Sequence, residues 1–190
     1  PGQGSQIVGM GYEFYNNFDY VKKLFDKADD ILKFKISKII LEGPESDLKL
    51  TKNTQPAILL VSCSIFQIFK KEFGLNLNQY KYFAGHSLGE YSALVCAQSL
   101  DFKDALYLVH ERGKEMQNAV PVGEGAMLAI LGLKLEEVYD FIKKLKSKNV
   151  CEVANDNAEG QTIVSGNVDS INELQILLKE NKKKSIKLPV

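Results

Sequence analysis

Cysteine, histidine and arginine are scarce in this 190-residue chain, and it has no net charge. Its three cysteines (Cys63, Cys96 and Cys151) are scattered and lack C-x-x-C spacing. This argues against a disulfide framework and a zinc site, and fits a reducing compartment. The balance of 24 Lys and Arg against 24 Asp and Glu removes any global field that would attract nucleic acid. The longest apolar run, 56–68, is interrupted by polar residues and is too short to span a bilayer.

The remaining composition is that of an ordinary globular protein, with 45% hydrophobic and 25% charged residues. Lysines gather at 182–184, where a solvated surface turn is the simpler interpretation and a patch for an acidic partner is the alternative. The chain opens at Pro1-Gly2, without an initiator methionine or a first strand, so we expect a fragment of a longer protein.

The first 122 residues are predicted to be mainly helical, from apolar spacing and from glycine and proline stops. We expect helices over 12–32, 46–50, 55–73, 88–98 and 101–118, with a short strand over 82–84. The helix starting at Gln55 would carry Pro56 in its first turn. One short strand cannot cover these helices, so this part is predicted to need further chain.

Beyond Gly123 the pattern changes to short strands alternating with helices. We expect strands over 126–131, 150–154, 162–165 and 185–188, helices over 135–146 and 169–181, and a polar turn over 155–160. The order β-α-β-β-α-β is that of the ferredoxin-like fold. The prediction is therefore an α/β protein with two domains, 1–122 and 123–190.

The sharpest local motif is Gly85-His86-Ser87-Leu88-Gly89, a G-x-S-x-G pattern between the expected strand and helix. Such an elbow holds a nucleophilic serine on a strained turn, where a side chain at either glycine would collide with its neighbour. The following helix N-terminus can stabilise an oxyanion, with the Leu88 N–H as its natural first donor. A plain glycine-rich turn is the alternative. The motif alone fits lipases, esterases, thioesterases and acyltransferases equally.

A nucleophilic serine also needs a base, normally histidine. Only His86 and His110 are available. His86 adjoins Ser87 on a tight turn, where neighbouring side chains point in different directions, and His110 falls in a helix, where a structural role is the default. Neither is a convincing base.

Arg112 is the only arginine, so the other 23 basic residues are lysine. An arginine in so lysine-rich a chain suggests a site that needs a planar, two-pronged donor, for which a carboxylate is the obvious target. Pairing with Glu111 or Glu115 on the helix surface is an equally good interpretation from this bias alone.

Together these residues resemble the malonyl-CoA:acyl-carrier-protein transacylase family of type II fatty-acid synthesis. The resemblance spans essentially the whole chain. It is carried by PGQGSQ at 1–6, TQPA at 54–57, GHSLGEYSA at 85–93, ERG at 111–113 with MQ at 116–117, GAM at 125–127, NDN at 155–157, GQ at 160–161 and VSG at 164–166.

The resemblance implies that Ser87 is the acyl nucleophile, that Gln3 and Leu88 offer backbone N–H groups to the oxyanion, that Arg112 holds the malonyl carboxylate and that Gln55 lines the pocket. The aliphatic Leu88 after the serine indicates an enzyme that selects malonyl groups. The implied fold is a hydrolase-like α/β large subdomain, incomplete here, with a ferredoxin-like small subdomain. The implied reaction needs no metal or cofactor, uses a coenzyme A thioester as substrate and has acyl carrier protein as partner. We expect a monomer, in bacterial cytoplasm or an organelle matrix, with no nucleic-acid or membrane partner.

The chain departs from the family at its end. The family's catalytic histidine follows a segment like the KLPV at 187–190, where this chain stops, so we expect truncation at both ends. Two other functions stay open: a serine esterase or thioesterase, which the elbow alone permits, and a non-catalytic module that binds carrier protein.

Overall fold

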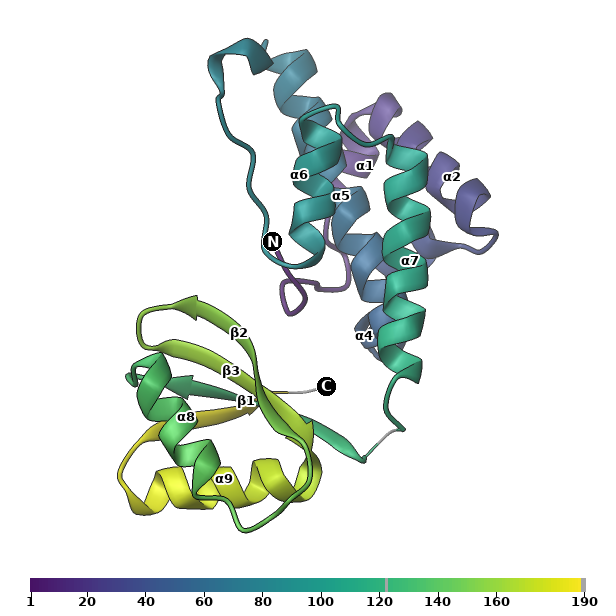
Figure 1. The fold of residues 1–190 in the computed structure, drawn as a ribbon. Coiled ribbons are helices and arrows are strands. Elements are labelled where there is room, and N and C mark those ends of the chain that lie inside the picture. Colours follow the sequence, from purple (N-terminus) through teal and green to yellow (C-terminus); the bar gives the residue numbers. More distant parts are fainter. Residues whose placement is uncertain (122, 189–190) are drawn as a thin grey trace. The chain divides into compact units, whose positions relative to one another are not determined.

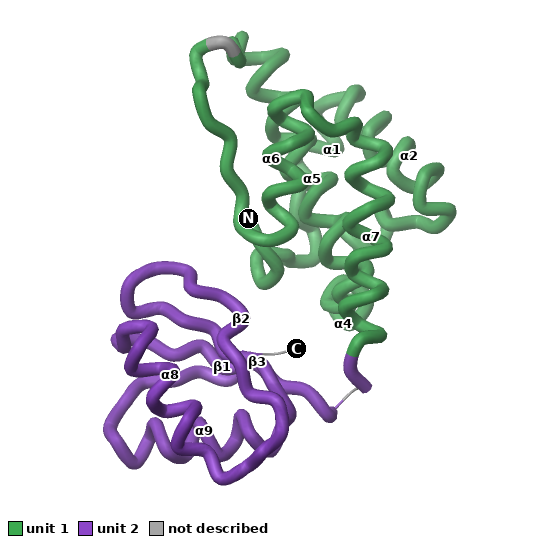
Figure 2. Tube along the Cα trace, viewed as in Figure 1, with its two compact units in different colours: residues 1–119 green, residues 120–190 purple. Residues whose placement is uncertain are grey.

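The computed structural model describes residues 1–121 and 123–188. The chain divides into two compact units, Pro1–Ala119 and Val120–Val190 (Figure 2). This division lies just after the last helix of the first unit, which ends at Asn118. Among the described residues, no helix is both long and apolar enough to cross a membrane.

Unit 1 is built from helices packed around one apolar core (Figure 1). Its elements are α1 (Tyr12–Asn17), α2 (Asp19–Leu32), α3 (Ile36–Glu42), α4 (Glu45–Lys49), α5 (Thr51–Glu72), a short 3-10 turn (Leu77–Gln79), α6 (Leu88–Cys96) and α7 (Phe102–Asn118). Helices α5, α6 and α7 pack against one another, and α2 packs on α5 and α7. Fully buried Phe25, Leu60 and Val109 link α2, α5 and α7 in the core.

The single helix expected over 12–32 is two helices. Phe18 adopts an extended conformation (φ −130°, ψ 108°) and separates α1 from α2. Its ring packs 5.5 Å from that of Tyr20, and both rings lie against the core of unit 1. Tertiary packing of these aromatic rings accompanies a break that helical spacing does not reveal.

Helix α5 starts at Thr51, four residues before the expected Gln55, so Pro56 is its sixth residue. A proline there removes the N–H that would bond to the carbonyl four residues earlier, that of Lys52. His110 Nδ1 lies 2.9 Å from this Lys52 oxygen and replaces the missing donor. The predicted helix start at Gln55 was wrong. The residue that bonds to the Lys52 carbonyl in place of Pro56 lies on another helix, α7, and the local sequence does not reveal it.

The strand expected over 82–84 does not form, and residues 82–85 have no regular secondary structure. Strands need a hydrogen-bonded neighbour, and the described part of unit 1 contains no strand to pair with this segment. Tyr82 is 88% exposed and Phe83 is 37% exposed. The segment therefore enters the serine turn as an unpaired chain.

Unit 2 is an antiparallel sheet packed on two helices (Figure 1). Its elements are β1 (Gly125–Leu131), α8 (Leu135–Lys143), β2 (Cys151–Ala158), β3 (Gln161–Asn167), α9 (Val168–Glu180) and β4 (Lys184–Leu188). The spatial strand order is β2-β3-β1-β4, and every adjacent pair is antiparallel. The chain order β-α-β-β-α-β is the one that the sequence pattern predicts.

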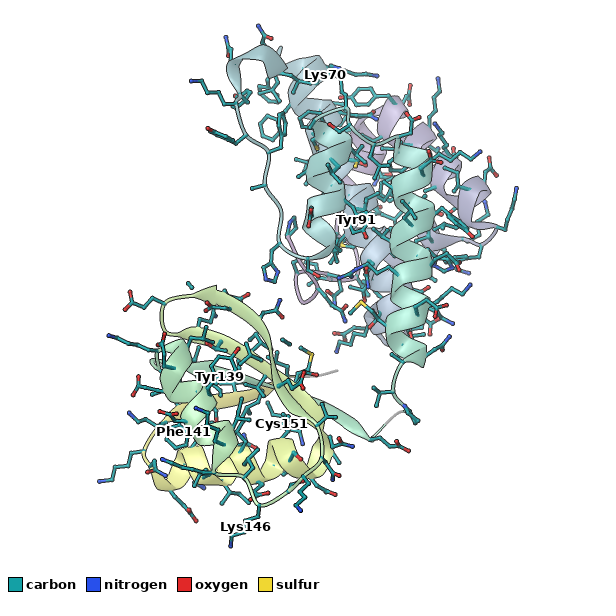
Figure 3. All side chains as sticks on the ribbon, viewed as in Figure 1. Lys70, Tyr91, Tyr139, Phe141, Lys146 and Cys151 are labelled. Carbon is teal, nitrogen blue, oxygen red and sulfur yellow. The ribbon has the colours of Figure 1, made fainter. Side chains whose placement is uncertain are left out.

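One face of this sheet forms the core of unit 2. The β1–β3 register pairs Leu128 with Val164, and both side chains are fully buried. Phe141 from α8 and Cys151 from β2 belong to the same core (Figure 3), as does Leu174 from α9. Both helices therefore cover the same face of the sheet.

The polar turn expected over 155–160 is mostly strand. β2 continues to Ala158 and pairs with β3 through Asn155–Ile163 and Asp156–Thr162, with irregular register on either side. Only Glu159 and Gly160 remain for the hairpin turn, and Gly160 has the positive φ (+79°) that such turns favour. Polar composition suggested a loop, but pairing with β3 keeps the segment extended.

Candidate active site

The serine turn has the strained geometry of a nucleophile elbow. Ser87 directly precedes α6 and has φ 53° and ψ −120°, which is costly for a residue with a side chain. A Cβ at Gly85 would collide with the Gly89 carbonyl, and one at Gly89 would lie 2.9 Å from the Pro1 carbonyl oxygen. Both glycines are thus required by close backbone approach, and Ser87 between them is exposed.

The helix start beside Ser87 can supply donors. Leu88 is the first residue of α6, and its side chain is fully buried, which anchors that end. N–H groups in a helix's first turn lack partners within the helix and point toward its N-terminus. The Leu88 N–H therefore lies at the start of α6, directly after Ser87.

The segment that carries Gln3 lies across the elbow. A Cβ at Gly2 would come 3.0 Å from His86 Nδ1, and the Pro1 carbonyl lies over Gly89. Gln3 Nε2 donates to Thr51 Oγ1 at 3.2 Å, which ties the segment to the start of α5. The structure thus brings Gln3 to the neighbourhood of the elbow from 84 positions away in sequence. Thr51 was not anticipated, because nothing in its local sequence signals this contact.

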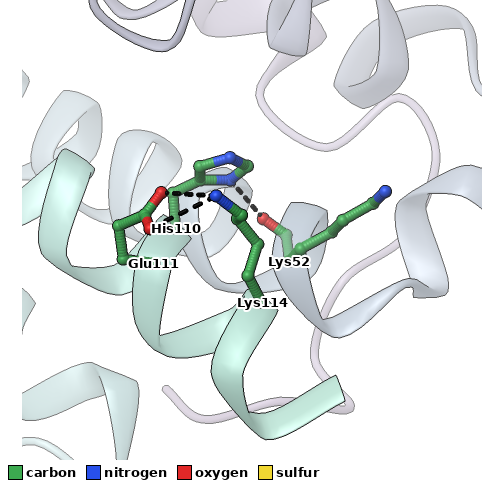
Figure 4. A network of polar contacts seen from close by, with 4 residues as sticks. All are labelled: Lys52, His110, Glu111 and Lys114. Atoms are coloured by element: carbon green, nitrogen blue, oxygen red, sulfur yellow. Dashed lines mark hydrogen bonds and ion pairs between the residues drawn. The ribbon is translucent and has the colours of Figure 1, made fainter. Parts of the chain in front are cut away.

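Arg112 points at the serine. Its Nη2 donates to Ser87 Oγ at 3.1 Å, and its Nη1 donates to Gln55 Oε1 at 2.6 Å. Glu111, a surface partner considered from sequence, is instead bonded to Lys114 Nζ at 2.9 and 3.2 Å (Figure 4). The hydrogen bonds of Arg112 therefore run to Gln55 and Ser87 rather than to Glu111.

Gln55 fixes the orientation of the guanidinium. Its side chain is completely buried, its Oε1 accepts from Arg112, and its Nε2 contacts Met116 Sδ at 3.3 Å. Because a guanidinium only donates, the oxygen of the amide must face Arg112 and its nitrogen must face the sulfur. Met116 belongs to a motif noted in the sequence but was given no role there; its spacing of four from Arg112 on one helix face was the available signal.

His110 is hydrogen-bonded to the main chain of α5 rather than to Ser87. Its Nδ1 donates to the Lys52 carbonyl (Figure 4). Its ring packs 5.4 Å from that of Phe34. This agrees with the structural role that was its default interpretation. The hydrogen bond that Ser87 receives comes from Arg112, whose guanidinium only donates. Of the KLPV segment that precedes the expected family histidine, residues 189 and 190 lie outside the described residues.

Two cysteines on α5 and α6 are poor candidates for a nucleophile. Burial raises the pKa of Cys63 on α5 to about 12 and that of Cys96 on α6 to about 11. A thiol attacks as its thiolate, which is scarce near neutral pH at these values. Within the described residues, no group of three or more His, Cys, Asp or Glu could hold a metal ion.

The remaining motifs of the resemblance lie in unit 2, on β1, β2 and β3 and at Gly160 in the β2–β3 turn. Gly166 on β3 is needed for packing, because a Cβ there would collide with the Val150 carbonyl. In the β1–β3 register, Met127 pairs with Ser165 on the face opposite the core of unit 2.

The profile of the family described as "Acyl transferase domain" matches residues 1–187. The chain belongs to this acyltransferase family. Over 192 residues it is 46% identical to the malonyl CoA-acyl carrier protein transacylase of Bacillus subtilis strain 168, covering 100% of this chain and 59% of that relative. The chain thus spans about three-fifths of the length of the curated relatives it matches.

Solved structures agree with this assignment. The acyl-carrier-protein S-malonyltransferase of Bartonella henselae matches with a TM-score of 0.93 and 39% identity, over 100% of this chain and 61% of that one. A malonyl-transacylase solved in complex with a type II polyketide acyl-carrier protein matches with a TM-score of 0.91 and 38% identity, over the same shares. Membership of the acyltransferase family thus rests on sequence and fold together.

Proposed function

We propose that the protein containing this chain transfers a malonyl group from coenzyme A to the phosphopantetheine thiol of acyl carrier protein, through a malonyl-Ser87 ester. The observation that carries this proposal is the pair of hydrogen bonds from Arg112, to Gln55 and to Ser87 Oγ. They put a fixed cation beside the nucleophile, where the acyl group must bind. The names of the relatives support the same substrate and partner.

The size of the malonyl group fits this arrangement. In a malonyl ester only one methylene separates the ester carbon from the carboxylate carbon, so the two lie roughly 2.5 Å apart. A carboxylate held so close to Ser87 Oγ falls within reach of the guanidinium, whose Nη2 is 3.1 Å from that oxygen. Arginine can then bind it with two parallel hydrogen bonds. An acetyl group leaves the guanidinium without this partner.

The reaction we propose has two steps. Ser87 Oγ attacks the thioester carbonyl while its proton passes to a base, and the carbonyl oxygen becomes an oxyanion facing the N–H groups of Leu88 and Gln3. Collapse expels the coenzyme A thiolate, which takes up a proton, and leaves malonyl-Ser87. The carrier-protein thiol then attacks this ester and regenerates Ser87. We assign the base to neither His86 nor His110.

We further propose the finer fold assignment. Residues 1–122 would form part of a hydrolase-like α/β catalytic subdomain, and residues 123–190 a ferredoxin-like small subdomain. The strand order β2-β3-β1-β4 with two helices on one face supports the second assignment. A location in bacterial cytoplasm or an organelle matrix and a monomeric state stay predictions.

The covalent step is tested by intact-mass spectrometry of the native-length protein before and after mixing with malonyl-CoA. We expect a malonyl-sized increment that is absent in Ser87→Ala. Rapid loss of the adduct in water without carrier protein would support the esterase or thioesterase alternative. Binding of carrier protein with no adduct under any condition would support the non-catalytic module.

The role of Arg112 is tested by acyl selectivity. Arg112 is half-buried, and leaving such a charged donor without a partner costs about 1–3 kcal/mol, so Arg112→Ala should lose about 5- to 150-fold in preference for malonyl-CoA over acetyl-CoA. Lys114→Ala is the matched control, because Lys114 is a nearby cation on α7 that pairs with Glu111. Unchanged selectivity in Arg112→Ala would refute the assignment.

A further inference from the structure

Helix α5 has a gap in its hydrogen bonding that a neighbouring helix fills. Pro56 lacks the N–H that would bond to the Lys52 carbonyl. His110 Nδ1, on α7, lies 2.9 Å from that carbonyl oxygen (Figure 4). A carbonyl oxygen only accepts, so Nδ1 carries the proton and donates whether the ring is neutral or charged. His110 thus supplies the bond that Pro56 removes.

The same turn of α5 receives two further contacts from α7. A Cβ at Gly113 would lie 2.6 Å from the Thr51 carbonyl oxygen and 2.7 Å from Lys52 Cα, so the two backbones touch there. Between His110 and Gly113, Arg112 donates to Gln55 Oε1. Positions 110, 112 and 113 of α7 therefore all engage residues 51–55 of α5.

These contacts restrict different movements of α7. The close approach of Gly113 to α5 prevents the two helices from moving closer together, but it allows α7 to slide along α5. The bond to the Lys52 carbonyl is directional and its acceptor is main chain, so it fixes the register of α7 along α5. The Phe34 ring, 5.4 Å from the imidazole, limits the orientations of His110. The His110 bond is therefore the contact best suited to define where Arg112 sits.

We propose that His110 is a positioning residue, which holds the Arg112 guanidinium at Ser87 by filling the hydrogen-bond gap at Pro56. The inference rests on the proposed function, because the position of Arg112 matters only if it binds the acyl carboxylate. It predicts that His110 governs malonyl selectivity without touching the substrate.

The test compares His110→Leu, which has no donor, with His110→Asn, whose Nδ2 can take the place of Nδ1. The rate of Ser87 acylation by malonyl-CoA and by acetyl-CoA is measured for the native-length protein. His110→Leu should lose about 5- to 30-fold in kcat/KM for malonyl-CoA, with little change for acetyl-CoA. His110→Asn should recover most of that loss. Equal malonyl selectivity in His110→Leu and wild type would overturn the proposal.

Two further variants separate positioning from plain stabilisation. Val109→Ala removes fully buried core packing from α7 without touching the Lys52 carbonyl, so it should lower stability and keep malonyl selectivity. Pro56→Ala restores an N–H opposite that carbonyl, so adding His110→Leu to it should cost less selectivity than His110→Leu alone. The proposal fails if Val109→Ala loses selectivity to the same extent, or if the Pro56→Ala background leaves the His110→Leu penalty unchanged.

Acylation of the wild-type protein distinguishes failure of the proposed function from failure of the role proposed for His110. Absence of any acyl-Ser87 in the wild-type protein would overturn the proposed function and this inference together. Acylation of wild type with unaltered selectivity in His110→Leu would overturn the role of His110 alone.

Discussion

Substituting Gly113 with alanine tests whether the α5–α7 contact sets the site. The added Cβ would lie 2.6 Å from the Thr51 carbonyl oxygen, 2.7 Å from Lys52 Cα and 3.0 Å from Lys52 N. Ordinary contact begins at 3.4 Å, so the closest approach is short by about 0.8 Å. All three atoms are main chain and cannot rotate away. The helices must therefore separate or tilt.

Two opposing energies decide the stability of Gly113→Ala. Replacing glycine by alanine inside a helix stabilises it by about 1 kcal/mol. Overpacking a close contact destabilises by about 1–3 kcal/mol, and separation also strains the bonds from His110 and Arg112. We expect a net loss of about 0–2 kcal/mol in the free energy of unfolding. The effect on acyl transfer should be larger, because a shift of about 1 Å in a positioning group can cost about 100-fold in rate.

The assay pairs urea unfolding with Ser87 acylation by malonyl-CoA in the native-length protein. Glu115→Ala, at an exposed position two residues along the same helix, should change both quantities little. The reasoning would be refuted if Gly113→Ala became about 1 kcal/mol more stable than wild type and kept wild-type acylation, because α7 would then have room for the methyl group.

Two further predictions concern groups outside the site. Backbone N–H groups of Lys146 and Ser147 donate to Glu173 and lower the pKa of its carboxyl below the ordinary 4.5. This stabilisation is present above the unfolded-state pKa and is lost as pH falls through the lowered folded-state pKa. Glu173→Gln should therefore unfold at lower urea than wild type at neutral pH, with the gap closing below the ordinary glutamate range; a gap that widens in acid would contradict this. Burial raises the pKa of all three cysteine thiols, so a colorimetric thiol reagent should react slowly with the native protein and fully in urea. Rapid reaction of buried Cys63 without denaturant would contradict it.

Features that depend on contiguous residues could be predicted from the sequence. The serine elbow is one, because the strain at Ser87 and the close approach at Gly85 belong to a single turn of five residues. The element order of unit 2 is another, because each element carries its own apolar pattern. The turn at Ser87 is present although no described strand pairs with the segment 82–84 before it.

Features that depend on a partner far along the chain could not be predicted. The polar segment after Asn155 is strand only because β3 pairs with it. For Arg112, the lysine-rich composition left a surface pair and a site role equally open. The packing of α7 on α5 brings Arg112 to Gln55, 57 positions away in sequence, a contact that no local pattern indicates.

The sequence by itself therefore determined the serine elbow, the family resemblance and the order of elements in unit 2, because each of these depends on short local motifs. Only the tertiary structure decided what Arg112, His110 and Gln3 contact. Hydrogen-bond partners are chosen by which helix faces meet, and that choice depends on packing the whole core rather than on any short stretch of residues. His110 shows the limit clearly: its partner is a backbone carbonyl freed by a proline on another helix.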